Sequence, residues 1–391
     1  MRSLELFAGA GGLALGMARA GFRHAAVIEW DRDACNTFRR NQENSSTSVE
    51  CWPVHQCDVR GFNYDSLGEV MVVSGGPPCQ PFSLGGKHRG FQDNRDMFPE
   101  AIRAVRELKP RAFIFENVKG LMRESFSSYF EYIHLQLTYP SVLRQQDETW
   151  IEHRARLERF HTANKKSSEY NVVFRLLNAA DYGVPQRRER VFFVGFRSDL
   201  GVEWTFPKAT HSEDALLASQ WIVGDYWDRH DIPRRRRPTL AGRQAQRVAR
   251  MARELGFEDE TSPWMTVRDA ISDLPDPQKI PYNGIANHAF IDGARTYPGH
   301  TGSPLDEPAK TLKAGDHGVP GGENMLVRPD GSVRYFTVRE AARIQTFPDE
   351  FVFQGSWTEA MRQLGNAVPV RLAEVVASSV AKTLRRRQLA K

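Results

Sequence analysis

The chain has 391 residues, of which 40% are hydrophobic and 26% charged, and its formal net charge is +5. This composition is that of a globular protein long enough for two domains, and the mild positive charge permits a polyanionic partner without requiring one. The four cysteines show neither a zinc-binding spacing nor a disulfide pattern, which suits a reducing compartment, and we expect no metal site. No apolar run is long enough to span a membrane.

Residues 1–31 have the pattern of a strand, a glycine-rich turn, a helix and a second strand. We expect the first strand at 3–7 and the helix at 13–20, with glycines between them that let a cofactor approach the backbone closely. The second strand ends in Glu29, about 20 residues after the glycines, where an acid suits a ribose diol. The glycine spacing is not GxGxxG, so a dinucleotide is not the first choice of cofactor.

The sequence Gly-Gly-Pro-Pro-Cys-Gln-Pro-Phe-Ser at 75–83 follows a short apolar run that is typical of a buried parallel strand. Its two consecutive prolines fix φ and remove backbone donors, so the strand cannot continue. Cys79 is therefore presented on a stiff turn at the carboxyl end of a strand, where open α/β sheets bind ligands. The alternative is a cysteine buried for packing. Residues 84–95 are expected to form a mobile loop able to close over a substrate.

A helix is expected from about residue 99 to 108, followed by a strand at 111–115 that ends in Glu116. A carboxylate in that position faces the same crevice as Cys79, although it could instead cap a helix. Residues 125–168 contain two helical patterns, at 129–137 and 149–160, and no chemistry that we identify.

Strands are expected at 172–177 and 191–195, and the run Gln-Arg-Arg-Glu-Arg precedes the second of them. Three arginines at the mouth of an α/β sheet can clamp an anion or a base edge, although a solvated edge is the alternative. Composition shifts after about residue 200 toward proline, glycine and arginine. Arg234 to Arg250 includes seven arginines and no acid, which indicates either a solvated face or a phosphate-contacting surface.

Residues 287–325 are rich in glycine and are expected to form loops, after a helix at 266–274. Regular structure returns with a helix at 337–346, and the segment Gly-Asn-Ala-Val-Pro at 365–369 precedes a final amphipathic helix that reaches about Lys382. No internal repeat is visible.

These motifs, taken in order, resemble those of the DNA (cytosine-5) methyltransferases of the bacterial restriction-modification type, over residues 1–200 and 335–385. The resemblance implies an α/β fold: a Rossmann-like sheet domain that binds S-adenosylmethionine, with a second, smaller, loop-rich target-recognition domain. It assigns residues 1–200 and 358–391 to the catalytic domain and 201–357 to target recognition. Within the latter, we expect 201–335 to choose the target sequence.

The resemblance also implies the roles of individual residues. Glu29 would hold the ribose hydroxyls of S-adenosylmethionine, Trp30 would pack on the adenine, and Asp58 would accept from the adenine amino group. The expected cofactor-binding residues are Phe7, Ala8, Gly9, Gly11, Gly12, Glu29, Trp30, Asp58, Val59, Pro78, Met97, Asn366 and Val368. The expected catalytic residues are Cys79, Glu116, Arg188 and Arg190, the two arginines lying near the target base. The expected DNA contacts are Gln80, Ser83, Arg234, Arg235, Arg236, Arg237 and Lys313.

By this resemblance the protein would methylate carbon 5 of a cytosine in duplex DNA and release S-adenosylhomocysteine. We expect a monomer in the cytoplasm, associated with the nucleoid, whose target a cognate restriction endonuclease could share without a stable complex. Two alternatives stay open: an RNA cytosine-5 methyltransferase, and a catalytically silent DNA-binding paralogue. A nicotinamide-dependent dehydrogenase is disfavoured by the glycine spacing, and it would leave Pro-Pro-Cys-Gln unexplained.

Overall fold

The computed structural model describes residues 1–44, 49, 51–78, 96–163, 168–253, 260–281, 284–298, 301–314 and 324–389. The chain divides into two compact units. The first consists of Met1–Leu177, Glu189–Pro207 and Ala373–Lys391, and the second of Asn178–Arg188 and Lys208–Leu372. The predicted domain ranges stay a prediction, and the compact units divide the chain at other positions, since 178–188 and 358–372 fall in the second unit.

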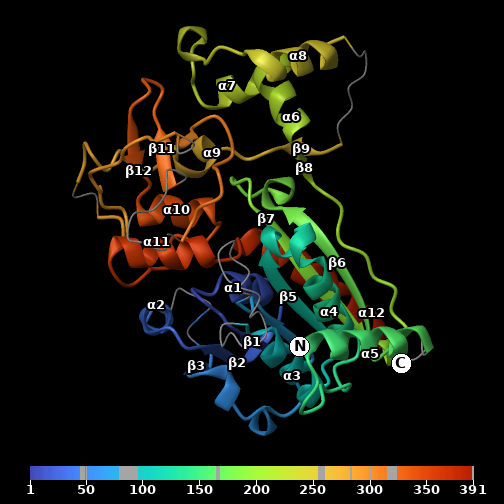
Figure 1. The fold of residues 1–391 in the computed structure, drawn as a ribbon. Coiled ribbons are helices and arrows are strands. Elements are labelled where there is room, and N and C mark those ends of the chain that lie inside the picture. Colours follow the sequence, from blue (N-terminus) through green and yellow to red (C-terminus); the bar gives the residue numbers. More distant parts are fainter. Residues whose placement is uncertain are drawn as a thin grey trace. The chain divides into compact units, whose positions relative to one another are not determined.

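The first unit is built on a seven-stranded sheet with the order β3-β2-β1-β4-β5-β7-β6 (Figure 1). The pairs from β3 to β5 are parallel, whereas β7 runs antiparallel to β5. The predicted mixed α/β fold is thus confirmed. The strands are β1 (Arg2–Leu6), β2 (Arg23–Glu29), β3 (Val54–Gln56), β4 (Val72–Gly75), β5 (Ala112–Val118), β6 (Tyr170–Asn178) and β7 (Glu189–Arg197).

Helices cover both faces of this sheet. Leu4, Leu6, Phe113 and Phe115 alternate along their strands and pack on α3 and α4 in one continuous apolar cluster. On the other face α1 packs closely against α12, since a Cβ built on Gly16 would lie 2.4 Å from the Cβ of Ala373. Each buried Leu or Phe contributes about 1.5–3 kcal/mol, so this double packing stabilises the sheet that carries the site.

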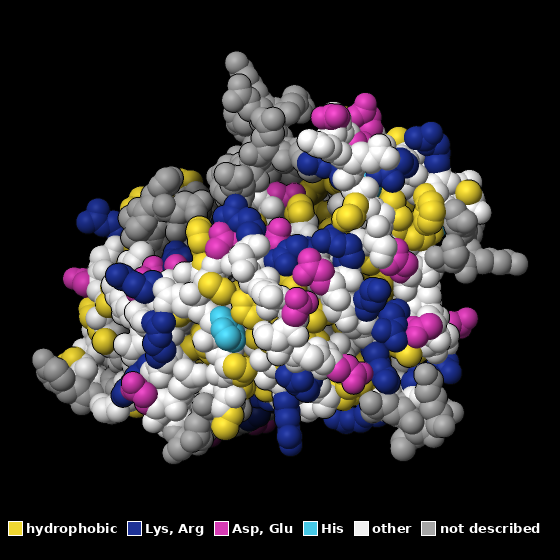
Figure 2. All heavy atoms as spheres, turned by 90° about the horizontal axis from the view of Figure 1, so that it is seen from below, with side chains coloured by type: hydrophobic (Ala, Val, Ile, Leu, Met, Phe, Trp, Pro, Cys, Tyr) yellow, Lys and Arg dark blue, Asp and Glu magenta, His cyan; other side chains and the backbone are white. Residues whose placement is uncertain are grey.

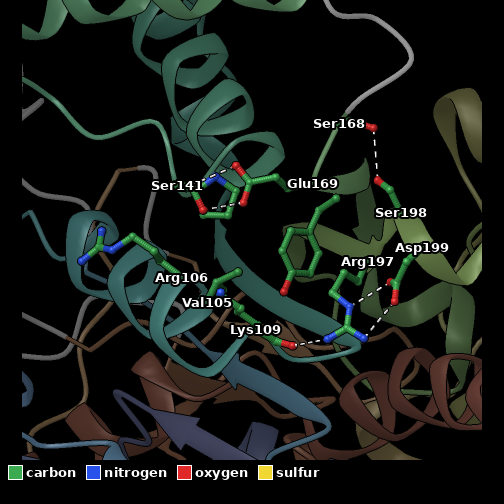
Figure 3. Close-up of a pocket in the computed structure, with 11 residues that line it drawn as sticks. Val105, Arg106, Lys109, Ser141, Ser168, Glu169, Arg197, Ser198 and Asp199 are labelled. Carbon is green, nitrogen blue, oxygen red and sulfur yellow. Dashed lines mark hydrogen bonds and ion pairs between the residues drawn. The ribbon is translucent and has the colours of Figure 1, made fainter.

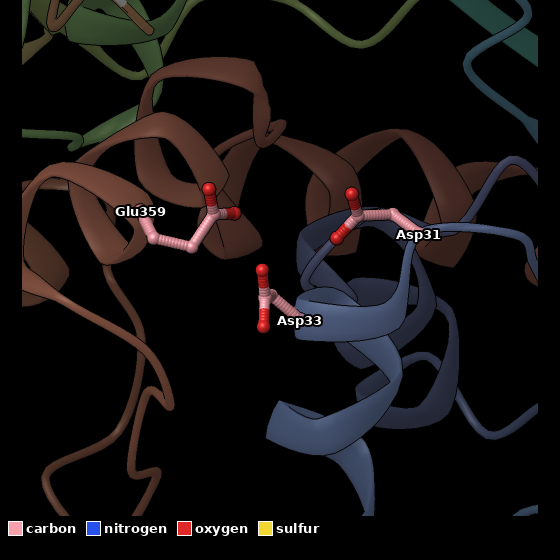
Figure 4. Close-up of side chains that lie close together, drawn as sticks. All are labelled: Asp31, Asp33 and Glu359. Carbon is pink, nitrogen blue, oxygen red and sulfur yellow. The ribbon is translucent and has the colours of Figure 1, made fainter. Parts of the chain in front are cut away.

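The helices of the first unit are α1 (Gly12–Arg19), α2 (Arg32–Gln42), α3 (Phe98–Leu108), α4 (Ser127–Thr138) and α5 (Trp150–Ala163), and α12 (Val370–Leu389) enters it from the second unit. All but α2 lie where the sequence predicts a helix. The side chain of Asp31 caps α2 by accepting from the backbone N–H of Ala34 at 2.8 Å, and Asp33 lies in its first turn (Figure 4). None of the described helices is long and apolar enough to cross a membrane.

The second unit contains a small sheet, β10 (Ser303–Pro304), β11 (Met325–Val327) and β12 (Val333–Tyr335), and the helices α9 (Val267–Ile271), α10 (Val338–Ile344) and α11 (Trp357–Asn366). Helices α9 and α10 confirm the predicted ones, and each begins with a complete capping box.

The sequence does not predict a group of helices that lies between β8 (His211–Ser212) and β9 (Ser262–Pro263): α6 (Glu213–Ala218), α7 (Asp225–Arg229) and α8 (Gly242–Met251) (Figure 1). Helices α6 and α7 are only six and five residues long, and α8 contains three arginines, so no long apolar periodicity marks them in the sequence.

A carboxyl group, that of Glu5 on β1, is fully buried beneath α1. Its Oε2 is hydrogen-bonded to the hydroxyl of Ser74 on β4, and burial raises the pKa of Glu5 to about 8. Glu5 and Ser74 pair across the sheet one position before Leu6 and Gly75, the last residues of their strands. The neutral carboxyl group therefore joins two strands close to their carboxyl ends.

A Glu5→Gln variant is expected to flatten the pH dependence of stability between about pH 4.5 and 8. The folded chain keeps a proton on Glu5 in this window that the unfolded chain has lost, so the wild type loses stability as pH rises. The free energy of unfolding in urea, measured at pH 5 and pH 8, should fall more in the wild type than in Glu5→Gln by about 3 kcal/mol. Equal pH dependence in both proteins would show that Glu5 ionises normally.

Candidate active site

The site is organised by the point at which the strand order reverses. The chain proceeds outward from β1 to β3 and then returns to place β4 on the other side of β1, so the loops after β1 and β4 diverge from neighbouring carboxyl ends. Leu6 and Gly75 pair directly there. A Cβ on Gly75 would lie 2.4 Å from the carbonyl oxygen of Leu6, so only glycine allows this approach. The predicted cofactor loop and the loop carrying Cys79 therefore start side by side.

Glu29 fastens the predicted cofactor loop to the end of β2. Its Oε2 accepts from the backbone N–H of Gly9 at 2.6 Å, and its Oε1 accepts from Trp30 and Asp31 at 2.9 and 2.8 Å. Burial raises the pKa of Glu29, and these three donors oppose that shift. Because each carboxylate oxygen has two lone pairs, Oε2 retains capacity to accept a ribose hydroxyl.

The surroundings of Glu29 fit S-adenosylmethionine. The indole of Trp30 is 70% exposed, an unusual state for a tryptophan at a strand end and one that suits stacking on adenine. No atom of the described residues lies within 4 Å of a Cβ built on Gly9, so this part of the loop leaves room for a ligand. Asp58 caps a 3₁₀ turn and pairs with Arg60, which holds the pKa of this exposed carboxyl below its usual range.

The other predicted cofactor residues fall into three groups. Phe7, Ala8 and Gly11 lie in the turn between β1 and α1, in which Gly11 donates its N–H to the carbonyl of Ala8 at 2.8 Å, and Gly12 is the first residue of α1. Met97 donates its N–H to the carbonyl of Pro78 at 3.0 Å, and Val59 is buried beside Asp58. Asn366 and Val368 belong to the second unit. The cofactor contacts of all three groups stay predictions.

A Glu29→Ala variant is expected to lose S-adenosylmethionine affinity by about 30- to 1,000-fold, equivalent to about 2–4 kcal/mol, because both the ribose acceptor and the anchor of Gly9 disappear. Affinity for duplex DNA should stay within about twofold, since Glu29 serves the cofactor loop alone. Isothermal calorimetry with S-adenosylhomocysteine measures the first effect. Asp58→Asn, which alters an exposed carboxylate, is the milder control; an unchanged cofactor affinity in Glu29→Ala would remove Glu29 from the site.

Glu116 and Arg190 form a buried ion pair across β5 and β7. The antiparallel register places Glu116 opposite Phe192, so Arg190, two residues away, projects from the same face as its diagonal neighbour. Arg190 Nε lies 2.8 Å from Glu116 Oε1, and their side chains are 11% and 8% exposed. Burial lowers the pKa of Arg190, and Glu116 opposes that shift. The structure thus brings together two of the four predicted catalytic residues.

The same strand end contacts the start of the Cys79 loop. A Cβ on Gly76 would lie 3.2 Å from Glu116 Oε2, so this second oxygen is directed toward that loop. Asn117 donates from its side-chain amide to the carbonyl of Pro77 at 2.9 Å. We assigned no role to Asn117 from the sequence beyond its place after Glu116. A side-chain amide can donate hydrogen bonds, whereas the two prolines at 77 and 78 have no backbone N–H, and this contrast could have pointed to Asn117. Cys79, Gln80, Ser83 and the predicted mobile loop at 84–95 lie outside the described residues.

Arg188 lies away from solvent, although we expected it near the target base. Its side chain is fully buried, and its guanidinium donates to the carbonyls of Leu312, Gly365 and Ala367 at 2.6–2.9 Å. Gly365 packs tightly there, since a Cβ would lie 2.3 Å from the backbone nitrogen of Ala314. This arrangement indicates a bracing role inside the second unit; a contact with the base stays a prediction.

The predicted DNA contacts have different surroundings. Arg234, Arg235 and Arg236 are exposed, whereas Arg237 donates to the carbonyl of Ile232. Lys313 is exposed, and its backbone is held at both its N–H and its carbonyl by the side chain of Asn324, at 3.0 and 2.9 Å. The sequence did not single out Asn324.

A pocket of about 410 Å³ lies at the opposite edge of the sheet from Glu116, near the start of β5 and the end of β7 (Figure 3). Its two acids are already engaged within it: Glu169 accepts from the hydroxyl of Ser141 at 2.7 Å, and Asp199 pairs with Arg197 at 2.8 Å. The pocket therefore plays no part in the candidate site.

Comparison with known proteins agrees with this geometry. The chain matches the family of C-5 cytosine-specific DNA methylases over residues 1–139 and 152–382. It is 31% identical to the Type II methyltransferase M.NgoMIV of Neisseria gonorrhoeae, over 98% of either chain. It is 32% identical to the Type II methyltransferase M.PspPI of Psychrobacter sp. (strain TA137), over 97% of this chain and 79% of that one.

Among solved structures, the Dnmt2 methyltransferase of S. pombe has a similar fold, with a TM-score of 0.55 and 16% identity over 99% of both chains. Three findings agree on the family of this chain. They are the order of the strands, the pairing of Glu116 on β5 with Arg190 on β7, and the sequence matches over nearly the whole chain. The chain belongs to the C-5 cytosine-specific DNA methylase family.

Proposed function

We propose that this protein transfers a methyl group from S-adenosylmethionine to carbon 5 of a cytosine in a specific duplex DNA sequence, through a covalent bond between the base and Cys79. Since the target atom cannot be reached inside a duplex, the cytosine is flipped out of the helix. Family membership supports the reaction, and the names of the curated relatives support a role as the modification enzyme of a restriction-modification system.

The chemistry accounts for the residue types. Carbon 5 of cytosine is a weak nucleophile until a thiolate adds to carbon 6, and cysteine is both a strong nucleophile and a competent leaving group. S-adenosylmethionine, when bound, supplies an electrophilic methyl group for carbon 5. Loss of the proton on carbon 5 and departure of the Cys79 thiolate then restore the ring. Glu116, carrying a proton on Oε2, donates a hydrogen bond to ring nitrogen 3 and so stabilises the negative charge that develops there.

The observation that carries the proposal is the ion pair of Glu116 with Arg190 beside the start of the Cys79 loop. Arg190 engages Glu116 Oε1, and we assign Oε2, on the Gly76 side, to the base. We also assign the guanidinium of Arg190 to the carbonyl oxygen of the base. Gly75 and Leu6 start the nucleophile and cofactor loops from adjacent strands, which suits direct methyl transfer between two bound molecules.

The partners follow from this reaction. Duplex DNA is the substrate, a cognate endonuclease would act on the same site without a stable complex, and the enzyme would act as a monomer in the cytoplasm, on the nucleoid. We further propose that residues 201–335 choose the target, because the motifs of the sheet are all accounted for by cofactor, nucleophile and base.

Methyl-labelled S-adenosylmethionine, incubated with the purified full chain and either unmodified bacterial DNA or total RNA, tests the function. We expect label in DNA alone, as 5-methylcytosine in the hydrolysed nucleosides and at one recurrent sequence. Label in RNA alone would identify an RNA methyltransferase. Binding of DNA without any transfer, with cofactor affinity intact, would identify the silent paralogue.

A further inference from the structure

The helices between β8 and β9, here called the helical insert (described parts of 211–263), pack in an apolar cluster that also includes Ala180 and Trp264 from outside this range. Tyr226 and Trp227 are fully buried and pack with Leu216 and Trp264. A second small cluster joins α6 to α8 and consists of Leu217, Val248 and Met251. The insert is therefore a packed scaffold that presents its outer side chains in fixed places, where the sequence predicted loops.

Some arginines of the insert are used to hold it together. Arg247 on α8 pairs with both Glu213 and Asp214 at the start of α6, at 2.6 Å each. Arg237 donates to the carbonyl of Ile232 at 3.1 Å and lies over the ring of Trp227, 5.8 Å from its centroid. These partners explain the two side chains without any ligand.

Within the segment 232–252 of the insert, five other arginines have no such use. All five are exposed, and within the described part of the chain none of their guanidinium groups pairs with a carboxylate; they are Arg234, Arg235, Arg236, Arg243 and Arg250. The segment from Ile232 to Ala252 contains no acid at all. Like charges gathered without counter-charges repel one another, so the stability of the insert does not explain them.

Two of the five arginines, Arg243 and Arg250, lie along one side of helix α8. Arg243 and Arg250 are two turns apart and share one side of the helix with Gln246, while Val248 and Met251 bury the other side. The two arginines are thus about 10 Å apart along the helix axis. The first turn of α8 has no acid and no side-chain cap, so its backbone N–H groups add to the attraction for anions.

This concentration of one charge differs from the face of the molecule drawn in Figure 2, on which basic and acidic side chains are interspersed. A row of exposed guanidinium groups on a rigid scaffold, without acids among them, is suited to the evenly spaced phosphates of a nucleic acid. Phosphate contacts fix a duplex in register but carry no sequence information.

We propose that the five unpaired arginines of the helical insert bind the phosphates of duplex DNA independently of base sequence, and so hold the duplex while other segments read it. This inference rests on the proposed function for its choice of DNA as the polyanion. The proposal divides the predicted role of residues 201–335 in two. The insert would bind DNA phosphates, and other residues of this range would recognise the bases.

The test measures DNA binding by fluorescence anisotropy between 50 and 300 mM salt (about a third to twice physiological ionic strength), with duplexes that contain or lack the methylated sequence. Arg243→Gln/Arg250→Gln should weaken binding to both duplexes by at least about 10-fold and lower the log–log salt slope by about 2. The triple variant Arg234→Gln/Arg235→Gln/Arg236→Gln should lower the log–log salt slope by about 3. Since the salt slope can be measured on a duplex of any sequence, failure of the proposed catalysis would not affect that part of the result.

Two controls distinguish a specific loss of DNA binding from a general effect of the lower net charge and from a loss of stability. Arg2→Gln/Arg23→Gln removes the same charge from the amino ends of β1 and β2, at the opposite edge of the sheet from the site, and should keep the wild-type slope. Arg247→Gln should lower the melting temperature more than Arg243→Gln/Arg250→Gln does. A wild-type slope in the test variants, an equal loss in the Arg2/Arg23 control, or a loss confined to the target duplex would each overturn the proposal.

Discussion

A Cys79→Ser variant is expected to lose methyl transfer by at least about 1,000-fold and to lose covalent trapping of the base altogether. A hydroxyl is a far weaker nucleophile than a thiolate at neutral pH, and nothing else at the start of this loop can replace it. DNA with 5-fluorocytosine at the target carries fluorine in place of the hydrogen on carbon 5, so the methylated adduct has no proton to lose and Cys79 cannot be eliminated. With S-adenosylmethionine present, the wild type should therefore form a complex that survives denaturation. Gel electrophoresis in detergent measures that complex.

The other cysteines serve as the matched control for this experiment. Cys35 is buried, and burial raises the pKa of its thiol to about 12, so Cys35→Ser should trap as the wild type does. Cys51 is exposed, and Cys51→Ser tests whether accessibility alone is enough for reaction. Trapping by Cys79→Ser would place the nucleophile elsewhere in the chain.

An Arg188→Ala variant is expected to destabilise the second unit by about 3–5 kcal/mol, because three buried carbonyls would lose their donor. The loss should appear as a lower unfolding midpoint in urea. Arg188→Lys should recover part of the lost stability, since an ammonium group can reach fewer of the three carbonyl oxygens than a guanidinium group does.

The neighbouring arginine provides the comparison. Arg187 is 40% exposed and pairs with Glu213 and Glu307 at 3.3 Å, so Arg187→Ala should cost no more than about 1 kcal/mol. If Arg188 instead binds the target base, Arg188→Ala would keep the wild-type stability and lose trapping of 5-fluorocytosine. That outcome would return Arg188 to the catalytic group and contradict the bracing role.

The sequence predicted six of the seven strands of the sheet because their signals are local, whereas it missed β3, which is short and lacks an apolar run. A buried parallel strand is a short apolar run, and the turns after β1 and β4 are marked by glycine and proline, whose backbone properties hold in any context. For the same reason it identified Glu29 and Glu116: each acid follows directly on an apolar strand, and strand ends share one edge of a parallel sheet. The order of the motifs along the chain was enough to predict the family.

What only the tertiary structure decided is which partner each charged side chain has. Arg188 and Arg190 stand two residues apart in one motif, yet one braces three carbonyls of the second unit and the other pairs with Glu116. The antiparallel register of β5 and β7 puts Arg190 beside Glu116, and no local pattern encodes that register. Likewise the arginines of helix α8 look alike in the sequence. In the folded chain Arg247 pairs with Glu213 and Asp214, whereas Arg243 and Arg250 are exposed. Long-range pairing depends on how distant segments pack, whereas a residue's own sequence neighbours determine its local conformation.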